Sequence, residues 1–422
     1  MIADPREFLT GLFRAAIAAA QPALCVPPNL PPPPRGRLIV VGAGKASAAM
    51  AAAAEAQYAA HRDVVGLVVT RDGHGVPCRR IEIVEAAHPV PDARAPEAAA
   101  RMLALAGGAG PDDLVLALMS GGGSALLALP QPPVTMAEFR ALTTALLKSG
   151  ANIHEMNAVR KHLSLIAGGR LAAAAAPAPM VTLAISDVPG DDPSTIGSGP
   201  TVADPTTLAD ARAVLAKYAI APAASIAARL ADAGNETPKP GDRLFASTRF
   251  VMAASPRQAL EVAIAKARAA GLAVHSLGDA VEGESRDVAR DQAALALSIA
   301  AGTGPVRPPC VLVSGGETTV TVRGQGRGGR NAEFLLALAL ALKGHPRIHA
   351  IAGDTDGIDG IESSAGATLA PDSLVRLAAA GVDAAARLAD NDAWTVFDRL
   401  GDLVVTGPTL TNVNDFRAML II

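Results

Sequence analysis

The stretch Arg37–Ala56, RLIVVGAGKASAAMAAAAEA, passes from an apolar strand through a glycine turn into an alanine-rich helix. Asp113–Leu127, DLVLALMSGGGSALL, repeats this order, and the strand-like segment Val64–Thr70 lies between the two. Strands that alternate with helices are typical of a parallel sheet, which binds its ligands at the carboxyl ends of the strands. The sequence therefore predicts an α/β fold with functional loops at Gly42–Ser47 and Ser120–Ser124.

A chain of 422 residues is too long for one ordinary core and suits two or three domains. The best linker lies in Ala231–Ser247, which is polar, rich in proline and glycine, and bordered by apolar runs. A second strand, helix and strand follow in Arg249–Gly278. We predict a larger Rossmann-like, parallel-sheet N-terminal domain (residues 1–236) and a smaller α/β C-terminal domain (residues 237–422). The last strand, near Phe416–Ile422, is a candidate to return to the first domain.

The composition argues against several classes of protein. A net charge of −3 gives no basic surface for nucleic acid, and no apolar run of 18 residues is free of charge. The cysteines, Cys25, Cys78 and Cys310, are odd in number and far apart, which fits neither a disulfide framework nor a zinc site. The N-terminus has no signal-peptide pattern. We expect a soluble cytoplasmic protein that binds neither nucleic acid nor membranes; the sequence specifies no oligomeric state.

A glycine- and arginine-rich loop, VSGGETTVTVRGQGRGGRNAEF, occupies Val313–Phe334 between a buried strand and a buried helix. Glycine lets a ligand approach the backbone, and arginine offers a fork of donors to phosphate or carboxylate. The loop is therefore a predicted anion site, although a flexible surface hairpin is an alternative. Its candidate nucleotide-binding residues are Gly315, Gly316, Glu317, Arg327, Gly328, Gly329 and Asn331.

The first glycine turn, GAGKAS, is an incomplete dinucleotide fingerprint because it lacks the third glycine or alanine. Asp72 and Arg71 lie near the end of the next strand, so a dinucleotide-binding site is one alternative. A structural turn is a further alternative. Phosphate binding is favoured because Lys45 stands at a helix N-terminus, where an anionic ligand offsets the repulsion by the helix dipole. The candidate residues of these first loops are Gly42, Gly44, Ser120, Gly121, Gly122, Gly123 and Ser124.

One helix and two acidic loops carry further candidates. His154, Asn157 and Arg160 share a helix stripe that suits the carboxylate of a small hydroxy acid, although a solvated face is the alternative. Asp187, Asp191 and Asp192 follow a strand and suit a general base or Mg²⁺ ligands, although loop aspartates usually make turns. Asp354 opens a loop that resembles half of a calcium-binding EF-hand. The sequence does not fit a calcium-binding loop, because Ala365 occupies the position of the essential glutamate. Magnesium, substrate contact or a plain turn remains.

Seven motifs, in chain order, closely resemble the class II glycerate kinases of the MOFRL family. They are GAGKA, SGGGSAL, HEMNAVRKHLS, SDVPGDDPSTIGSGPT, SGGETTVTVRGQGRGGRNAEF, GDTDGIDG and TNVNDF, and the likeness runs from about residue 5 to the end. Members of this family are also called hydroxypyruvate reductases. The resemblance implies transfer of the γ-phosphoryl group of ATP, with Mg²⁺, to the 2-hydroxyl of D-glycerate in a cleft between the domains. It points to Lys45 and Arg330 as catalytic residues and places Asp187 close to the chemistry.

The residues themselves give these roles a physical reason. Phosphoryl transfer needs cations around a spreading negative charge and an acceptor for the hydroxyl proton. Lys45 and Arg330 suit the first task, and Asp187 suits the second or holds Mg²⁺. We assign Asn157, Arg160 and His154 to the substrate carboxylate, and Asp191, Asp192 and Asp354 to the metal. An NAD(P)H-dependent hydroxypyruvate reductase and a non-enzymatic nucleotide or glycerate sensor are the alternatives.

Overall fold

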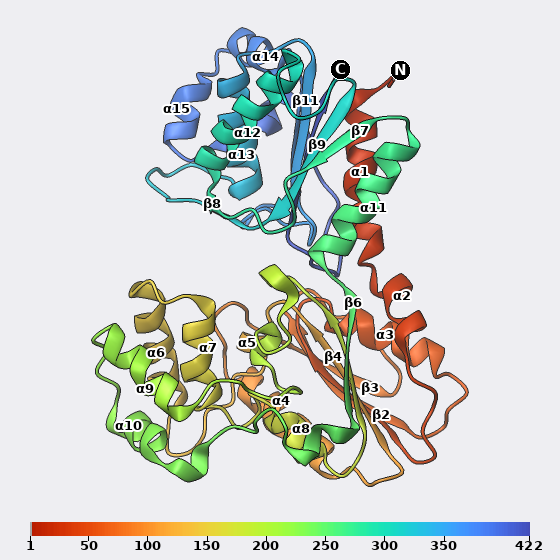
Figure 1. The fold of residues 1–422 in the computed structure, drawn as a ribbon, viewed down its shortest axis with the longest axis vertical. Helices are drawn as coiled ribbons and strands as arrows, with labels where there is room; N and C mark the ends of the chain where they lie inside the picture. Colours follow the sequence, from red (N-terminus) through yellow and green to blue (C-terminus); the bar gives the residue numbers. More distant parts are fainter. Residues whose placement is uncertain (1) are drawn as a thin grey trace. The chain divides into compact units, whose positions relative to one another are not determined.

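The computed structural model describes residues 2–422 and divides the chain into two compact units (Figure 1). The N-terminal unit is Pro22–Ala253. The C-terminal unit combines Ala254–Ile422 with the first segment of the chain, which ends at Gln21. The main division thus lies after residue 253, later than the predicted boundary at 236/237, and the first helix belongs with the C-terminal unit.

A six-stranded sheet in the order β3-β2-β1-β4-β5-β6 forms the centre of the N-terminal unit. Strands β1 to β5 pair in parallel, which confirms the predicted Rossmann-like parallel sheet. β1 and β4 lie at the centre and every residue in them is buried, as expected for strands covered on both faces. The strands are β1 (Leu38–Ala43), β2 (Val64–Arg71), β3 (Ile81–Ala86), β4 (Leu114–Ser120), β5 (Met180–Ile185) and β6 (Thr248–Ala254).

β6 explains the shifted boundary. We predicted this strand as the start of the second domain, but it extends the sheet of the N-terminal unit beside β5. Its apolar pattern predicts a strand correctly and carries no information about which sheet it joins. The proline-rich run that begins at Pro22 contains α2 (Pro22–Cys25) and a 3₁₀ turn (Pro27–Asn29).

Helices α3 (Ser47–Gln57), α4 (Arg94–Gly107) and α8 (Arg170–Ala175) pack on or near this sheet. A separate helical layer has its own apolar core and consists of α6 (Met136–Lys148), α7 (Ile153–Lys161), α9 (Leu208–Lys217) and α10 (Ala224–Ala231). The short helix α5 (Gly123–Leu126) lies between α4 and α6 in the chain. Thr135 and Asn152 form capping boxes that begin α6 and α7. Such caps stabilise a helix by about 1 kcal/mol.

Residues 152–176 do not form one helix, because the chain breaks after α7 and starts a new helix at α8. Gly168 (φ 59°) and Gly169 (φ 81°) adopt left-handed backbone in the gap. A side chain on Gly169 would stand 2.8 Å from the carbonyl oxygen of Val202. The two glycines therefore allow the chain to turn closely past a neighbouring loop.

The C-terminal unit contains a mixed six-stranded sheet in the order β13-β12-β11-β14-β9-β7. β14 lies between β11 and β9 and is antiparallel to both, so the last strand stays in this unit and does not return to the first. The strands are β7 (Ala273–Ser276), β9 (Cys310–Gly316), β11 (Ile348–Asp354), β12 (Gly366–Leu369), β13 (Leu403–Val404) and β14 (Asp415–Ile421); β8 (Gly283–Glu284) pairs separately with β10 (Thr318–Thr319).

Helices cover both faces of this mixed sheet (Figure 1). One face carries α1 (Pro5–Ala19) and α11 (Pro256–Ala269), and the other carries α12 (Ser285–Ala300) and α13 (Arg330–Leu342). α1 begins with Asp4 as its N-cap and Pro5 in its first turn, as the local sequence favours. Three short helices lie between β12 and β13: α14 (Ser373–Ala379), α15 (Ala384–Ala389) and α16 (Ala393–Leu400).

Within residues 2–422, no single helix is long and apolar enough to cross a membrane. One bent pair, Pro5–Ala19 with Pro22–Asn29, passes that test on length and composition alone.

Candidate functional site

The predicted loops after β1 and β4 meet in the N-terminal unit. The backbone N–H of Lys45 donates to the carbonyl oxygen of Gly121 over 2.9 Å. The N–H of Ala46 donates to the Ser120 hydroxyl over 3.0 Å. Backbone hydrogen bonds thus hold Lys45 against the glycine turn that follows β4.

The loop after β5 joins them through Asp187. Gly121 has no side chain, and a Cβ there would stand 1.8 Å from Oδ2 of Asp187. The carboxylate therefore lies directly against the glycine that accepts the hydrogen bond from Lys45. The structure brings Lys45, Gly121 and Asp187 together, at the carboxyl ends of three neighbouring strands.

Ser124, Asn157, Arg160 and Ser198 form a polar cluster beside this turn. The hydroxyls of Ser124 and Ser198 lie 2.8 Å apart, and Ser198 donates to Oδ1 of Asn157 over 3.1 Å. Arg160 donates from Nη2 to the carbonyl oxygen of Ser124 over 3.4 Å. Nδ2 of Asn157, a residue only 1% exposed, and Nε of Arg160 have no acceptor in the part of the chain that the structure describes.

These donors favour an anionic ligand. Burial lowers the pKa of the Arg160 guanidinium, as it does for a cation removed from water without a counter-ion. A buried donor without an acceptor is unfavourable by about 1–3 kcal/mol. A ligand that brings carboxylate or phosphate oxygens relieves both penalties.

His154, Asp191 and Asp192 are further candidate residues of the N-terminal unit, and their surroundings differ from those of the polar cluster. The His154 side chain is 65% exposed, and its Nδ1 is 4.0 Å from Oδ2 of Asp192. Asp192 accepts hydrogen bonds from the N–H and hydroxyl of Ser194 and from the hydroxyl of Thr195. Burial raises the pKa of Asp192, but these donors outweigh burial and hold the pKa below its usual range. The carboxylate therefore stabilises its own turn, which is the alternative that the sequence left open.

Arg330 is the centre of a second cluster, in the C-terminal unit. It is the first residue of α13, and three carboxylates hold it at 2.8 Å: Glu317 on Nη1, Asp354 on Nη2 and Asp415 on Nε. Burial lowers the pKa of Arg330, but the charges of Asp415, Asp354 and Glu317 outweigh it and raise the pKa overall. Asp415 is absent from the predicted site, although it belongs to the quoted TNVNDF motif.

Asp415 also organises the buried side of this cluster. It accepts from Nδ2 of Asn331 over 2.8 Å and from Nη2 of Arg417 over 2.7 Å. Arg417 is 1% exposed. Asp359, which is 2% exposed, accepts from the N–H groups of Asn331 and Ala332 and so caps α13. Burial raises the pKa of Asp359 to about 6. Arg330 is therefore fixed by β11, β14 and the start of its own helix.

The glycine-rich loop of the C-terminal unit packs on the segment 390–394. A Cβ on Gly324 would stand 2.2 Å from the carbonyl oxygen of Asp390. One on Gly329 would stand 2.3 Å from Oδ1 of Asp359. Close packing of the protein on itself is thus a sufficient reason for these glycines.

Arg327 binds within the same unit. Its Nη2 is 2.6 Å from Oε2 of Glu362, and its guanidinium lies 3.9 Å from the ring centroid of Trp394. The alternative of a flexible surface hairpin is therefore not favoured, because side chains hold the loop in place. The nucleotide role of Arg327, Gly328 and the neighbouring glycines stays a prediction.

Several other candidate glycines lie within or next to strands. Gly42 is inside β1, where a Cβ would stand 2.2 Å from the carbonyl oxygen of Leu118. A Cβ on Gly44 would stand 2.1 Å from the Ser120 hydroxyl, which already accepts the N–H of Ala46. Gly315 and Gly316 end β9. These four residues have structural reasons independent of a ligand, and their nucleotide role stays a prediction.

The candidate metal ligands are spread over both units. Asp191 and Asp192 belong to the N-terminal unit and Asp354 to the C-terminal unit. Residues 2–422 contain no group of three or more His, Cys, Asp or Glu side chains arranged to hold a metal ion. The metal role of the three aspartates stays a prediction.

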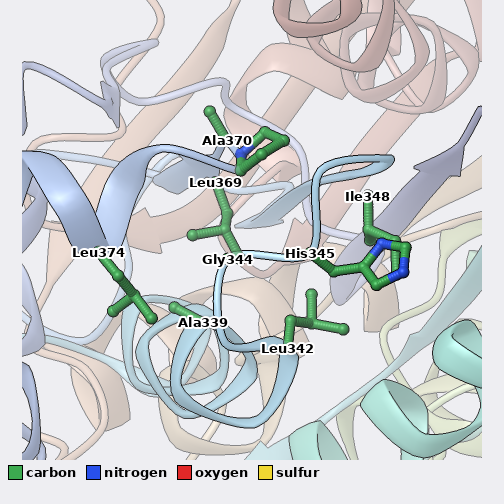
Figure 2. A pocket seen from close by; sticks show the side chains of 9 residues that line it. Ala339, Leu342, Gly344, His345, Ile348, Leu369, Ala370 and Leu374 are labelled. Atoms are coloured by element: carbon green, nitrogen blue, oxygen red, sulfur yellow. The ribbon is translucent and has the colours of Figure 1, made fainter.

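Figure 2 shows a hollow at the C-terminal end of α13, the end of this helix opposite Arg330. Its volume of about 10 Å³ holds no more than a water molecule. Its lining is aliphatic apart from the ring of His345, and it consists of Ala339, Leu342, Gly344, His345, Ile348, Leu369, Ala370, Pro371 and Leu374.

Comparison with known proteins identifies relatives along nearly the whole chain. Residues 8–231 match a family described as a domain of unknown function, DUF4147, and residues 310–415 match the MOFRL family. A protein from Agrobacterium vitis named "Putative hydroxypyruvate reductase" is 58% identical, over 99% of this chain and 94% of its own. The D-glycerate 2-kinase of Thermotoga maritima is 37% identical, over 97% of each chain.

A solved structure agrees with the sequence comparison. The crystal structure of a glycerate kinase from Thermotoga maritima covers 99% of both chains, with a TM-score of 0.90 and 36% identity. The match therefore extends over both units.

Proposed function

Because the chain belongs to the MOFRL family, whose relatives here include glycerate kinases, we propose that it transfers the γ-phosphoryl group of ATP to the 2-hydroxyl of D-glycerate. The products are 2-phosphoglycerate and ADP. The observation that carries this proposal is the convergence of Lys45, Gly121 and Asp187 at one edge of a parallel sheet. A cytoplasmic location is part of the same proposal.

Lys45 and Asp187 supply the two things that phosphoryl transfer asks of a protein. The ammonium group of Lys45 stabilises the charge that spreads over the transferred phosphoryl group. The carboxylate of Asp187 accepts the proton of the attacking hydroxyl. Gly121 sets the position of both, through its carbonyl oxygen on one side and its missing side chain on the other.

Asn157 and Arg160 bind the carboxylate of D-glycerate, with His154 at the exposed edge. The donors that lack acceptors, Nδ2 of Asn157 and Nε of Arg160, support this role. Their surroundings also explain specificity for an acid, since an uncharged alcohol leaves the Arg160 guanidinium without a counter-charge.

Arg330 provides a second cation. Its raised pKa keeps the guanidinium charged at any working pH. The three carboxylates around it leave the Arg330 cluster net negative, which favours a nucleotide that arrives with Mg²⁺ over a bare polyphosphate. When bound, Mg²⁺ neutralises charge on the phosphates, and Asp354 is the candidate ligand in this cluster.

A dinucleotide-dependent reduction of hydroxypyruvate has less support. The N–H of Ala46 at the start of α3 is taken by the Ser120 hydroxyl, where a dinucleotide fold binds pyrophosphate. Asp72, the candidate for a ribose hydroxyl, makes two bonds of 2.7 and 2.8 Å to Arg94. In both cases a group that a dinucleotide would bind at this turn already has a partner within the protein.

Phosphorus NMR of the protein with MgATP and D-glycerate tests the proposal. A 2-phosphoglycerate resonance should rise as ATP becomes ADP. Lys45→Ala should lower kcat by about 10²-fold or more with the fold retained, whereas Lys148→Ala, an exposed lysine at the end of α6, should not. Intact ATP, together with oxidation of NADH by hydroxypyruvate, would replace the kinase with the reductase.

A further inference from the structure

A pocket of about 340 Å³ opens beside the glycine turn of the N-terminal unit. Its walls come from the loop after β3, from the Gly122–Ala128 segment, from α6 and from Arg160 on α7. The lining residues are His88, Pro89, Val90, Pro91, Gly122, Ser124, Ala125, Ala128, Phe139, Arg140, Thr143, Thr144, Leu147 and Arg160.

The pocket is polar at one end and apolar at the other. Ser124 and Arg160 belong to the polar cluster next to the catalytic turn. A Cβ on Gly122 would stand 2.9 Å from the ring of His88, so this ring packs closely on the glycine at the same end of the pocket. Away from that turn the walls are mostly proline, valine, leucine and phenylalanine side chains, with Arg140, Thr143 and Thr144 among them.

The ionisable side chains that line the pocket are all basic. The lining includes two arginines and a histidine and contains no aspartate or glutamate. Arg140 donates from Nη2 to the carbonyl oxygen of Pro91, which ties α6 to the loop after β3, and its Nε has no acceptor in the described chain. A ligand with a negative end and a flat, weakly polar end matches this arrangement.

The pocket volume favours the nucleotide over D-glycerate as the ligand of this pocket. Pockets of about 300–1,000 Å³ are typical of sites that bind drug-sized ligands and cofactors. D-glycerate is small and polar along its whole length, so it would leave the apolar end empty. Purine rings are flat and apolar on both faces, and they fill such a space well.

We propose that this pocket binds the nucleoside of the phosphoryl donor, with the base between the loop after β3 and α6 and the phosphates at Gly122 and Ser124. This inference rests on the proposed function and places the donor in the N-terminal unit. Arg160 stands between the two ligands, and its five N–H donors suffice for a phosphate on one edge and the glycerate carboxylate on the other.

Titration calorimetry of the full chain with MgADP tests the site. Thr144→Trp fills the pocket from an exposed position on α6, and Leu147→Glu places a charge at its apolar end. Both should raise the Kd for MgADP at least tenfold. Ala141→Trp adds the same bulk to an exposed position of α6 outside the pocket and should leave the Kd within twofold.

Two further measurements separate the occupants. Inorganic tripolyphosphate, which has no nucleoside, should bind to Thr144→Trp and wild type alike, and the KM for D-glycerate should stay within twofold. A raised KM for D-glycerate with an unchanged Kd for MgADP would assign the pocket to the acceptor and overturn the proposal, as would no change in either. Nucleotide binding that depends on Thr144 without any phosphoryl transfer would keep the pocket and reject the kinase.

Discussion

Gly121→Ala should disable the enzyme through Asp187. The added Cβ would stand 1.8 Å from Oδ2 and 2.4 Å from Cγ of that carboxylate. Real contacts of this kind begin at 3.0 Å, so Oδ2 must move by at least 1.2 Å (from 1.8 Å to 3.0 Å). A 1 Å misplacement of a reacting group lowers the rate by about 10²-fold. We expect a loss of that size in kcat, measured by coupled ADP release, with an unchanged circular dichroism spectrum.

A double-variant cycle shows whether the effect acts through Asp187. Asp187→Ala removes the atoms that the new Cβ would strike, so Gly121→Ala should add little in that background. Gly107→Ala is the matched control, because a Cβ there meets only one atom, 3.8 Å away. Retention of kcat within threefold by Gly121→Ala would refute the reasoning, as would losses that multiply in the double variant.

Three other perturbations test the C-terminal unit and the metal. Asp415→Asn should lower the free energy of unfolding in urea by about 3–5 kcal/mol, since it leaves the buried Arg417 without its counter-charge; a change below about 1 kcal/mol contradicts this. Asp359 binds a proton in the folded chain up to about pH 6 but in the unfolded chain only up to about pH 4. Its stabilising contribution is thus present below about pH 4 and is lost as the pH rises through 6. The unfolding free energy of wild type relative to Asp359→Asn should therefore fall by about 3 kcal/mol over that window, and a flat difference excludes the raised pKa. Removal of Mg²⁺ with EDTA should abolish turnover and leave the unfolding midpoint unchanged, because residues 2–422 contain no preformed metal cluster; a lower midpoint indicates a structural metal.

Local patterns predicted much of the fold correctly. The apolar runs of β1 and β4 and the glycine turns after them depend only on neighbouring residues, and the cap of α1 at Asp4 does too. The convergence of Lys45 and Asp187 also followed from the sequence, because parallel strands bring their carboxyl ends to one edge. The family resemblance is confirmed by the matching family models and relatives.

Long-range pairing was not predictable from one sequence. β6 has an ordinary apolar pattern, which does not say which of two sheets it extends. Arg330 and Asp415 are separated by 85 positions, and neither residue alone indicates the other. A glycine-rich stretch also cannot reveal what approaches it. At Gly324 and Gly329 the close neighbour is the protein itself.

The packing of α1 in the C-terminal unit has a consequence during translation. Leu9, Leu12 and Phe13 of this helix are fully covered only by residues that the ribosome makes last, since α1 packs on α11, β11 and β14. At about 5–20 residues per second, the helix waits roughly 20–80 s for its partners while residues 22–253 can already fold. Its apolar face is meanwhile a natural substrate for chaperones. A fragment beginning at residue 254 would lack the helix that seals one side of its sheet.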